Sequence, residues 1–222
     1  MKKYAAEFIG TFALVFCGTG AIVIDQQTGG QVGHVGIAMT FGFIVLAMIY
    51  TFGEVSGAHF NPAVTIGFWV AKRFDGKQIA PYIISQSAGA LMASVVLKLL
   101  FPANESLGAT IPAGSNIQSF VLEFILTYFL MLVIINVSQG SKETGTLAGI
   151  AIGTTVLLEA MFAGPICGAS MNPARSLAPA LVSGNMQALW LYISAPIIGS
   201  IAATITWRLM NLKKIVAINP KT

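Results

Sequence analysis

Charged side chains are scarce in this sequence. Of its 222 residues only 9% are Asp, Glu, Lys or Arg, whereas 55% are hydrophobic and the mean hydropathy is +0.79. A soluble domain usually carries about 25% charged residues. The deficit argues against a soluble domain and for a chain that lies within a lipid bilayer.

Cysteine and histidine are also rare, with two of each. Cys17 and Cys167 lie in apolar or Gly-rich surroundings without Cys-x-x-Cys or Cys/His spacing, which argues against a disulfide framework and a zinc site. No Ser/His/Asp, metal-ligand or phosphate-loop pattern occurs, so we expect neither an enzyme nor a cofactor or metal. The net charge of +4 comes from bases in short loops and tails, and therefore does not indicate nucleic-acid binding.

Six apolar runs have the length that a bilayer core of about 30 Å requires. They cover about residues 4–24, 35–52, 79–101, 117–137, 146–162 and 188–209. The first resembles a secretory signal, but Glu7 interrupts it and it is long enough to span, so we interpret it as a membrane span. We predict an all-α, multi-pass membrane protein with a single domain over residues 1–222.

Lysine and arginine are unevenly distributed among the connections between these spans. Ten of the twelve fall on one predicted side: Lys2, Lys3, Lys72, Arg73, Lys77, Lys142, Arg208, Lys213, Lys214 and Lys221. Loops rich in Lys and Arg stay in the cytoplasm. We therefore expect an inner or plasma membrane location with both termini in the cytoplasm.

Two Asn-Pro-Ala triplets interrupt the pattern of spans: Asn61-Pro62-Ala63 and Asn172-Pro173-Ala174. Asn is a strong N-cap and Pro suits the first helical position, so each triplet begins a helix. These helices end near residues 71 and 182, which gives each about ten residues and about 15 Å, half of a bilayer core. We predict two re-entrant half-helices that enter from opposite faces and meet tip to tip.

The two halves of the chain repeat one pattern. Glu7-Phe-Ile-Gly-Thr-Phe12 aligns with Glu123-Phe-Ile-Leu-Thr-Tyr128, and the residues before each triplet also align, Gly-Ala-His-Phe with Gly-Ala-Ser-Met. Each half, about 1–112 and 113–222, has three spans. Because three is odd, the second half must be upside down relative to the first. Inverted repeats with interrupted helices are a transport architecture.

The stretches before the triplets, residues 53–60 and 164–171, are rich in Gly. We predict that neither is continuous helix. Irregular backbone at membrane depth is tolerated only where protein buries it or water lines it. The carbonyls of these stretches and the Asn side chains are therefore expected to face a polar path.

These motifs resemble the aquaporin (major intrinsic protein) superfamily over essentially the whole chain. Gly-Ala-His-Phe-Asn-Pro-Ala-Val-Thr and Phe-Ala-Gly-Pro-Ile-Cys-Gly-Ala-Ser-Met-Asn-Pro-Ala-Arg-Ser are most similar to the nodulin-like intrinsic proteins and their bacterial relatives. The resemblance implies a homotetramer in membrane lipid with one pore per subunit. Such a pore passes water and small uncharged solutes: glycerol, urea, and undissociated boric, silicic or arsenous acid.

The resemblance also implies residue roles. Asn61 and Asn172 would donate hydrogen bonds to a single file of solute. The selectivity constriction would consist of Phe41, Ala160, Ala169 and Arg175. Strict water channels of the family have His where Ala160 stands, so its methyl group predicts a wider pore with one donor fewer.

Four further residues are candidates around this path. In the family, the counterparts of Glu7 and Glu123 hold backbone N–H groups of the loops that carry the triplets. His59 precedes Asn61 by two residues and is expected to line the cytoplasmic vestibule. Cys167 precedes Asn172 by five and is expected to face the lumen, whereas His34 is expected to lie in a loop.

Three other functions stay open. A strict water pore is disfavoured by the small residues Ala160 and Ala169. A secondary transporter would need intramembrane acids placed for ions, and Glu54 and Glu159 have no assigned role, although we expect Glu159 to pack against a neighbouring helix or subunit. A non-conducting junction or adhesion protein could also have this fold.

Overall fold

The structure is a computed structural model, and it describes residues 1–138 and 142–211, with the side chains of residues 142–146 excepted. Within these ranges the chain is entirely helical apart from its connections. The elements are α1 (Lys2–Gln27), α2 (Gly33–Ser56), α3 (Pro62–Val70), the 3-10 helix η1 (Gly76–Gln78), α4 (Ile79–Leu100), α5 (Asn116–Val137), α6 (Lys142–Cys167), α7 (Pro173–Ser183) and α8 (Leu189–Met210).

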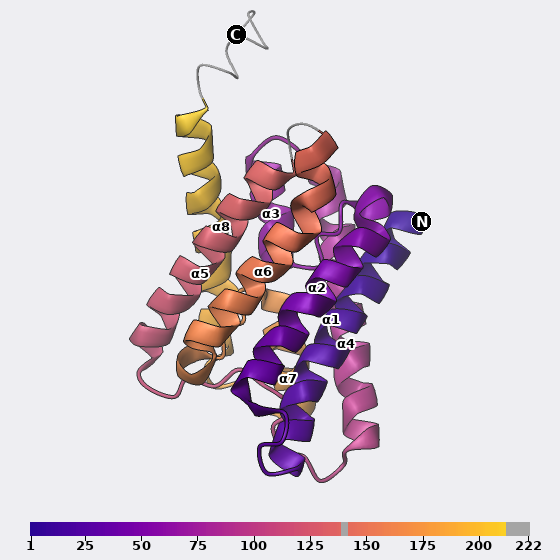
Figure 1. Cartoon of the computed structure of the whole chain (residues 1–222), viewed down its shortest axis with the longest axis vertical. Coiled ribbons are helices and arrows are strands. Elements are labelled where there is room, and N and C mark those ends of the chain that lie inside the picture. Colours follow the sequence, from indigo (N-terminus) through magenta and orange to yellow (C-terminus); the bar gives the residue numbers. More distant parts are fainter. Residues whose placement is uncertain (139–141, 212–222) are drawn as a thin grey trace, which may run out of the picture.

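Six of these helices are long and apolar enough to cross a membrane: α1, α2, α4, α5, α6 and α8. Two helices are much shorter, α3 with 9 residues and α7 with 11. Figure 1 shows α3 toward the upper end of the bundle and α7 toward the lower end. The predicted fold class, six spans with two half-helices, is therefore confirmed.

Helix pairs approach closely where a glycine removes a side chain. A Cβ on Gly89 of α4 would collide with the carbonyl oxygen of Phe8 in α1. A Cβ on Gly199 of α8 would collide with that of Phe124 in α5. Phe8 and Phe124 occupy equivalent positions of the internal repeat, so the α1–α4 and α5–α8 pairs are the same packing unit used twice.

Neither stretch before a triplet is continuous helix, as predicted, but the non-helical part begins later than the sequence indicates. Helix α2 continues through Ser56 and α6 through Cys167, so only residues 57–61 and 168–172 are non-helical. The helices end where Gly57 (φ 85°) and Gly168 (φ 81°) adopt the left-handed conformation that commonly terminates a helix. Gly53 and Gly164, the earlier glycines of these stretches, stay helical despite the cost of about 1 kcal/mol that a glycine within a helix carries.

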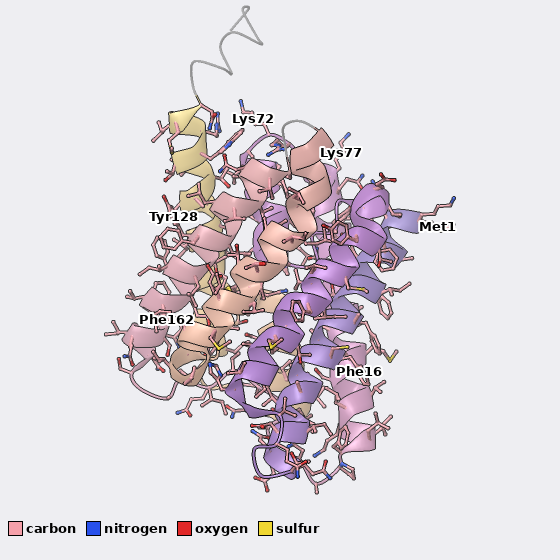
Figure 2. The ribbon with its side chains drawn as sticks, viewed as in Figure 1. Met1, Phe16, Lys72, Lys77, Tyr128 and Phe162 are labelled. Atoms are coloured by element: carbon pink, nitrogen blue, oxygen red, sulfur yellow. The ribbon has the colours of Figure 1, made fainter. Side chains whose placement is uncertain are left out.

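Some of the bases used to predict the orientation of the chain can be placed in the structure. Two of these bases, Lys72 and Lys77, lie in the upper half of the view in Figure 2, where Met1 also lies and where α8 ends. Some members of the predicted set lie outside the described residues or side chains: Lys142, Lys213, Lys214 and Lys221.

Candidate functional site: a pore through the bundle

A cavity of about 800 Å³ lies inside the helix bundle. Its lining extends from Glu54 and Ser138, near the ends of α2 and α5, to Arg175 in α7. Most of the lining side chains are apolar. The polar groups are concentrated in the non-helical residues 57–61 and 169–172, where both half-helices begin.

Each half-helix begins with the cap that the triplets predict. Asn61 has an extended backbone, and its Oδ1 accepts from the N–H of Ala63 at 2.8 Å. Asn172 is also extended, and its Oδ1 accepts from the N–H groups of Ala174 (3.0 Å) and Arg175 (3.3 Å). Pro follows each Asn at the first helical position, where its missing N–H costs nothing.

The two half-helix tips are joined by reciprocal hydrogen bonds. Asn61 Nδ2 donates to the carbonyl of Met171 (2.7 Å), and Asn172 Nδ2 donates to the carbonyl of Phe60 (2.8 Å). An amide nitrogen has a second N–H, and both Asn side chains line the cavity. The two tips therefore present donors side by side at the centre of the cavity.

The segments before the tips share an unusual backbone. Ala58 and Phe60 have φ of 50° and 48°, and their counterparts Ala169 and Met171 have φ of 41° and 53°. Positive φ is uncommon for residues other than Gly and costs of order 1–3 kcal/mol. The same strain therefore occurs at two equivalent positions in each half of the chain, and equivalent contacts in the two halves maintain it.

Glu7 supplies those contacts in the first half. Its carboxylate is buried in α1 and accepts from the backbone N–H groups of His59 (3.0 Å) and Phe60 (2.7 Å). Ser56 Oγ (2.7 Å) and Gln86 Nε2 (2.8 Å) donate to the same carboxylate. A buried carboxylate is tolerable because four donors satisfy it.

Glu123 occupies the equivalent place in the second half. It is 0% exposed and accepts from the backbone N–H groups of Ser170 and Met171, both at 2.7 Å. Hydrogen bonds to an ionised acceptor are about twice as strong as neutral ones. The carboxylate therefore holds residues 168–172 in the strained shape that places Asn172.

Three of the four expected constriction residues meet at one end of the cavity. Phe41, Ala169 and Arg175 line it, and the Arg175 guanidinium carbon lies 5.1 Å from the centre of the Phe41 ring. Arg175 is only 2% exposed, and its Nη1 donates to the carbonyl of Gly108 at 2.8 Å. Ala160 is buried and lies one helical turn beyond Val156, the last residue of α6 that lines this cavity.

The Phe41 ring needs space that Gly18 provides. A Cβ on Gly18 would overlap the ring of Phe41. In the same way, a Cβ on Gly10 would overlap the ring of Phe60. Two glycines of α1 therefore make room for one expected constriction residue, Phe41, and for Phe60 beside the half-helix tips.

Cys167 does not line the cavity, and the expectation that it faces the lumen is wrong. Its side chain is 0% exposed, with Sγ 3.6 Å from the carbonyl of Ala163 one turn earlier. Its own carbonyl accepts from the hydroxyl of Tyr192 in α8 at 2.7 Å. Because α6 continues through Cys167, the thiol packs inside the bundle instead of projecting from a loop.

His59 lines the cavity beside the first half-helix. Its ring packs against Phe68, Phe74 and Tyr82, with centroids 4.8, 4.8 and 5.2 Å away. Its Nδ1 lies 3.1 Å from Thr65 Oγ1. The aromatic contacts and this hydrogen bond fix the ring at the wall of the cavity.

Residues 101–115 contribute a contact that the sequence did not reveal. This connection presents the Gly108 carbonyl to Arg175, and Thr110 Oγ1 donates to Ser176 Oγ at 2.9 Å. Asn104 Oδ1 accepts from the N–H of Leu107 at 2.7 Å and shapes the turn before Gly108. In the sequence, only Gly108 itself indicates a turn in this connection, and nothing indicates its contact with Arg175. Within the described ranges, no three His, Cys, Asp or Glu side chains gather as a metal site would require.

Two capped half-helices that meet inside six membrane spans define a membrane pore. The profile of the family described as "Major intrinsic protein" matches residues 1–207, and the chain therefore belongs to the major intrinsic protein family. The predicted relationship to nodulin-like members is also confirmed by similar sequences. Aquaporin NIP1-1 of Oryza sativa subsp. japonica is 44% identical over 212 residues (95% of this chain, 75% of the relative). Nodulin-26 of Glycine max is 43% identical over 212 residues (95% and 78%).

A solved structure shows the same architecture. The X-ray structure of the aquaglyceroporin from Plasmodium falciparum superposes with a TM-score of 0.84. The match covers 93% of this chain and 94% of that one, at 27% sequence identity. The shared fold thus includes nearly all of both chains.

Proposed function

We propose that this protein is a passive channel for water and small uncharged solutes. The observation that carries the proposal is the pair of half-helix tips joined across the cavity by Asn61 and Asn172. Water or a hydroxyl compound can exchange hydrogen bonds with amide donors and backbone carbonyls along such a path. The family and the relatives described above support the same function.

Electrostatics favours neutral solutes over cations. Each half-helix presents roughly +0.5 charge at its N-terminus, and both tips face the cavity. A monovalent cation about 5 Å from both tips would be opposed by about 3 kcal/mol at an effective dielectric of about 20. Arg175 opposes it again at the constriction. Positive half-helix ends and an Arg are known to exclude cations and protons from aquaporin-type pores.

Small constriction residues favour glycerol-sized solutes over water alone. Ala169 and Ala160, two of the four expected constriction residues, have only methyl side chains, and by the family resemblance Ala160 stands where strict water channels have His. We infer a pore that passes glycerol, urea and undissociated boric, silicic or arsenous acid together with water. A strict water channel is the alternative, and Phe41, which narrows one wall, is the residue in its favour.

Flux through purified protein in lipid vesicles tests the proposal. Stopped-flow light scattering would record shrinkage in an osmotic step and re-swelling as glycerol, urea, boric acid or silicic acid enters. We expect fast, non-saturating re-swelling that protein-free vesicles lack. Fast shrinkage without re-swelling would indicate a strict water pore. Saturable, gradient-coupled uptake would indicate a transporter, and the absence of any flux would indicate a junction or adhesion protein.

We further infer the setting in which this channel works. It is a homotetramer in an inner or plasma membrane, its halves are residues 1–112 and 113–222, and both termini are cytoplasmic. Large apolar side chains on the outside of the bundle support lipid contact: Phe162, which projects from α6 in Figure 2, is 64% exposed. The channel acts without enzymatic chemistry, a cofactor, a metal or nucleic acid.

A further inference from the structure

Helix α6 contains a proline near its outer end. Pro165 has no N–H, so it cannot donate to the carbonyl four residues earlier, which belongs to Met161. A backbone carbonyl left unpaired at membrane depth costs several kcal/mol. Some other donor must therefore satisfy Met161 if the helix is to continue to Cys167 as it does.

His34 is that donor. It was expected in a loop, but it is the second residue of α2, and its Nε2 lies 2.6 Å from the Met161 carbonyl oxygen. A carbonyl can only accept, so Nε2 carries the hydrogen in this contact. The side chain of one helix thus replaces the backbone N–H that the other helix lacks.

Gly164 makes room for this contact. A Cβ at that position would lie 2.9 Å from Cε1 of the His34 ring, which is closer than real Cβ atoms come to a neighbour. Three residues therefore act together: a proline that frees a carbonyl, a glycine that opens the approach, and a histidine that donates.

The contact joins the two helices that carry Phe41 and Ala160, two of the expected constriction residues. Ala160 immediately precedes Met161 in α6. Phe41 follows His34 by seven residues in α2, about 10 Å along the helix. Helices α2 and α6 also approach closely at Gly42 and Gly153, where a Cβ on either residue would lie 2.7 Å from the other's carbonyl oxygen. Helices α2 and α6 lie side by side in Figure 1, and the His34 contact joins them again near the start of α2 and the end of α6.

We propose that His34 is a positioning residue for selectivity. By donating to the Met161 carbonyl, it holds the outer end of α6 against α2 and so sets the distance between Phe41 and Ala160. This inference rests on the proposed channel function, because its consequence is read in the ratio of two fluxes. His34 itself does not contact solute.

Four variants test the role: His34→Ala, His34→Gln, Pro165→Ala, and the double variant with His34→Ala and Pro165→Ala. We expect His34→Ala to change the ratio of glycerol to water permeability at least threefold. His34→Gln retains a donor at a similar reach and should restore the ratio to within twofold of wild type. In the Pro165→Ala background the backbone N–H returns, so the added His34→Ala change should shift the ratio by less than a factor of 1.5.

Val35→Ala is the matched control, since its side chain is exposed on the same turn of α2. It should leave the ratio unchanged. If His34→Ala lowers both fluxes in proportion, or shifts the ratio equally with and without Pro165, then His34 is only a structural residue and the proposal fails.

A measurement without flux separates this proposal from the channel function. Nitrogen-15 NMR of the full-length protein in lipid reports the tautomer of each histidine, and His34→Gln assigns the two signals. We expect His34 to carry its hydrogen on Nε2 at neutral pH. A neutral His34 protonated on Nδ1 would overturn the contact. Vesicles that conduct neither water nor glycerol would instead overturn the channel.

Discussion

Ala160 is the residue whose size we expect to decide which solutes pass, because its expected neighbours in the constriction, Phe41 and Arg175, are in contact with each other. Its side chain is a single methyl group, buried one turn beyond the cavity-lining Val156. Protein interiors are closely packed and resist added volume, which typically costs about 1–3 kcal/mol. A small change at this position should therefore act on large solutes before it acts on water.

Ala160→His should abolish most glycerol flux. The ring fills the space beside Phe41 and adds a donor near the guanidinium of Arg175. A barrier higher by about 3 kcal/mol lowers the rate about a hundredfold, whereas water, which is narrower, should lose far less. Stopped-flow glycerol and water permeabilities of the same vesicles give both values. Glycerol flux equal to wild type would show that Ala160 is not at the constriction, and equal loss of both fluxes would indicate a blocked pore.

Cys167→Ser should leave the response to mercurials unchanged. The thiol of Cys167 is fully buried, so a mercurial in the lumen has no path to it. Wild type and variant should therefore show the same water permeability after treatment, with the half-buried Cys17 as the remaining thiol. Loss of mercurial inhibition in Cys167→Ser alone would mean that the thiol reaches the lumen after all.

At the scale of elements, the half-helices and the segments before them are held by groups that are distant in sequence. Each Asn uses its Oδ1 to cap its own helix and its Nδ2 to bind the opposite tip. Glu7 and Glu123 hold the two strained segments from α1 and α5. Replacing a single oxygen or nitrogen in one of these four side chains should therefore displace a half-helix or the segment before it.

Asn172→Asp should lower the flux of neutral solutes. Asp still caps α7, because Asp is as good an N-cap as Asn. It cannot donate, however, so two acceptors would face each other where Nδ2 now binds the Phe60 carbonyl, and a carboxylate would enter the centre of the pore. We expect at least a tenfold loss of glycerol flux, and the same from Asn61→Asp, its counterpart. Unchanged water and glycerol flux in both folded variants would argue against a central Asn pair.

Glu123→Gln should destabilise the protein. A glutamine can accept from one of the N–H groups of Ser170 and Met171, but it brings an N–H group of its own to a site that needs acceptors. Leaving a buried donor unsatisfied costs about 1–3 kcal/mol, so the thermal unfolding midpoint in detergent should fall. Glu54→Gln, at an exposed position of α2, is the control and should unfold like wild type. Equal midpoints for all three proteins would contradict a supporting role for Glu123.

The whole molecule shows which features local sequence can predict. The membrane spans can be predicted from composition. The starts of the half-helices can be predicted from the Asn-Pro caps, because a cap binds backbone N–H groups within three residues of itself. The ends of α2 and α6 were predicted too early, because several glycines occur there and only tertiary contacts decide which one stops a helix. Pro165 leaves the Met161 carbonyl without its helical donor, and His34 replaces that donor from 127 residues away, which no local pattern indicates. The partner of Arg175 is a backbone carbonyl 67 residues away, which no side-chain pattern encodes.

The orientation of the whole chain is testable by labelling. In a variant without Cys17 and Cys167, a cysteine introduced by Asp75→Cys would lie beside Lys72 and Lys77, and one introduced by Asn104→Cys in the opposite connection. A membrane-impermeant maleimide should label Asn104→Cys in intact cells, whereas Asp75→Cys should react only after lysis. The reverse pattern would overturn the predicted cytoplasmic side.

The reciprocal bonds between the half-helix tips also determine when the pore can form. They join residues 110 and 112 positions apart in the chain. During synthesis, α3 is complete long before the ribosome reaches Asn172, and until then Asn61 Nδ2 and the Phe60 carbonyl lack the partners that they have in the folded pore. The first half of the chain therefore cannot form the paired tips alone. The centre of the permeation path is complete only after the second half has inserted and packed against the first.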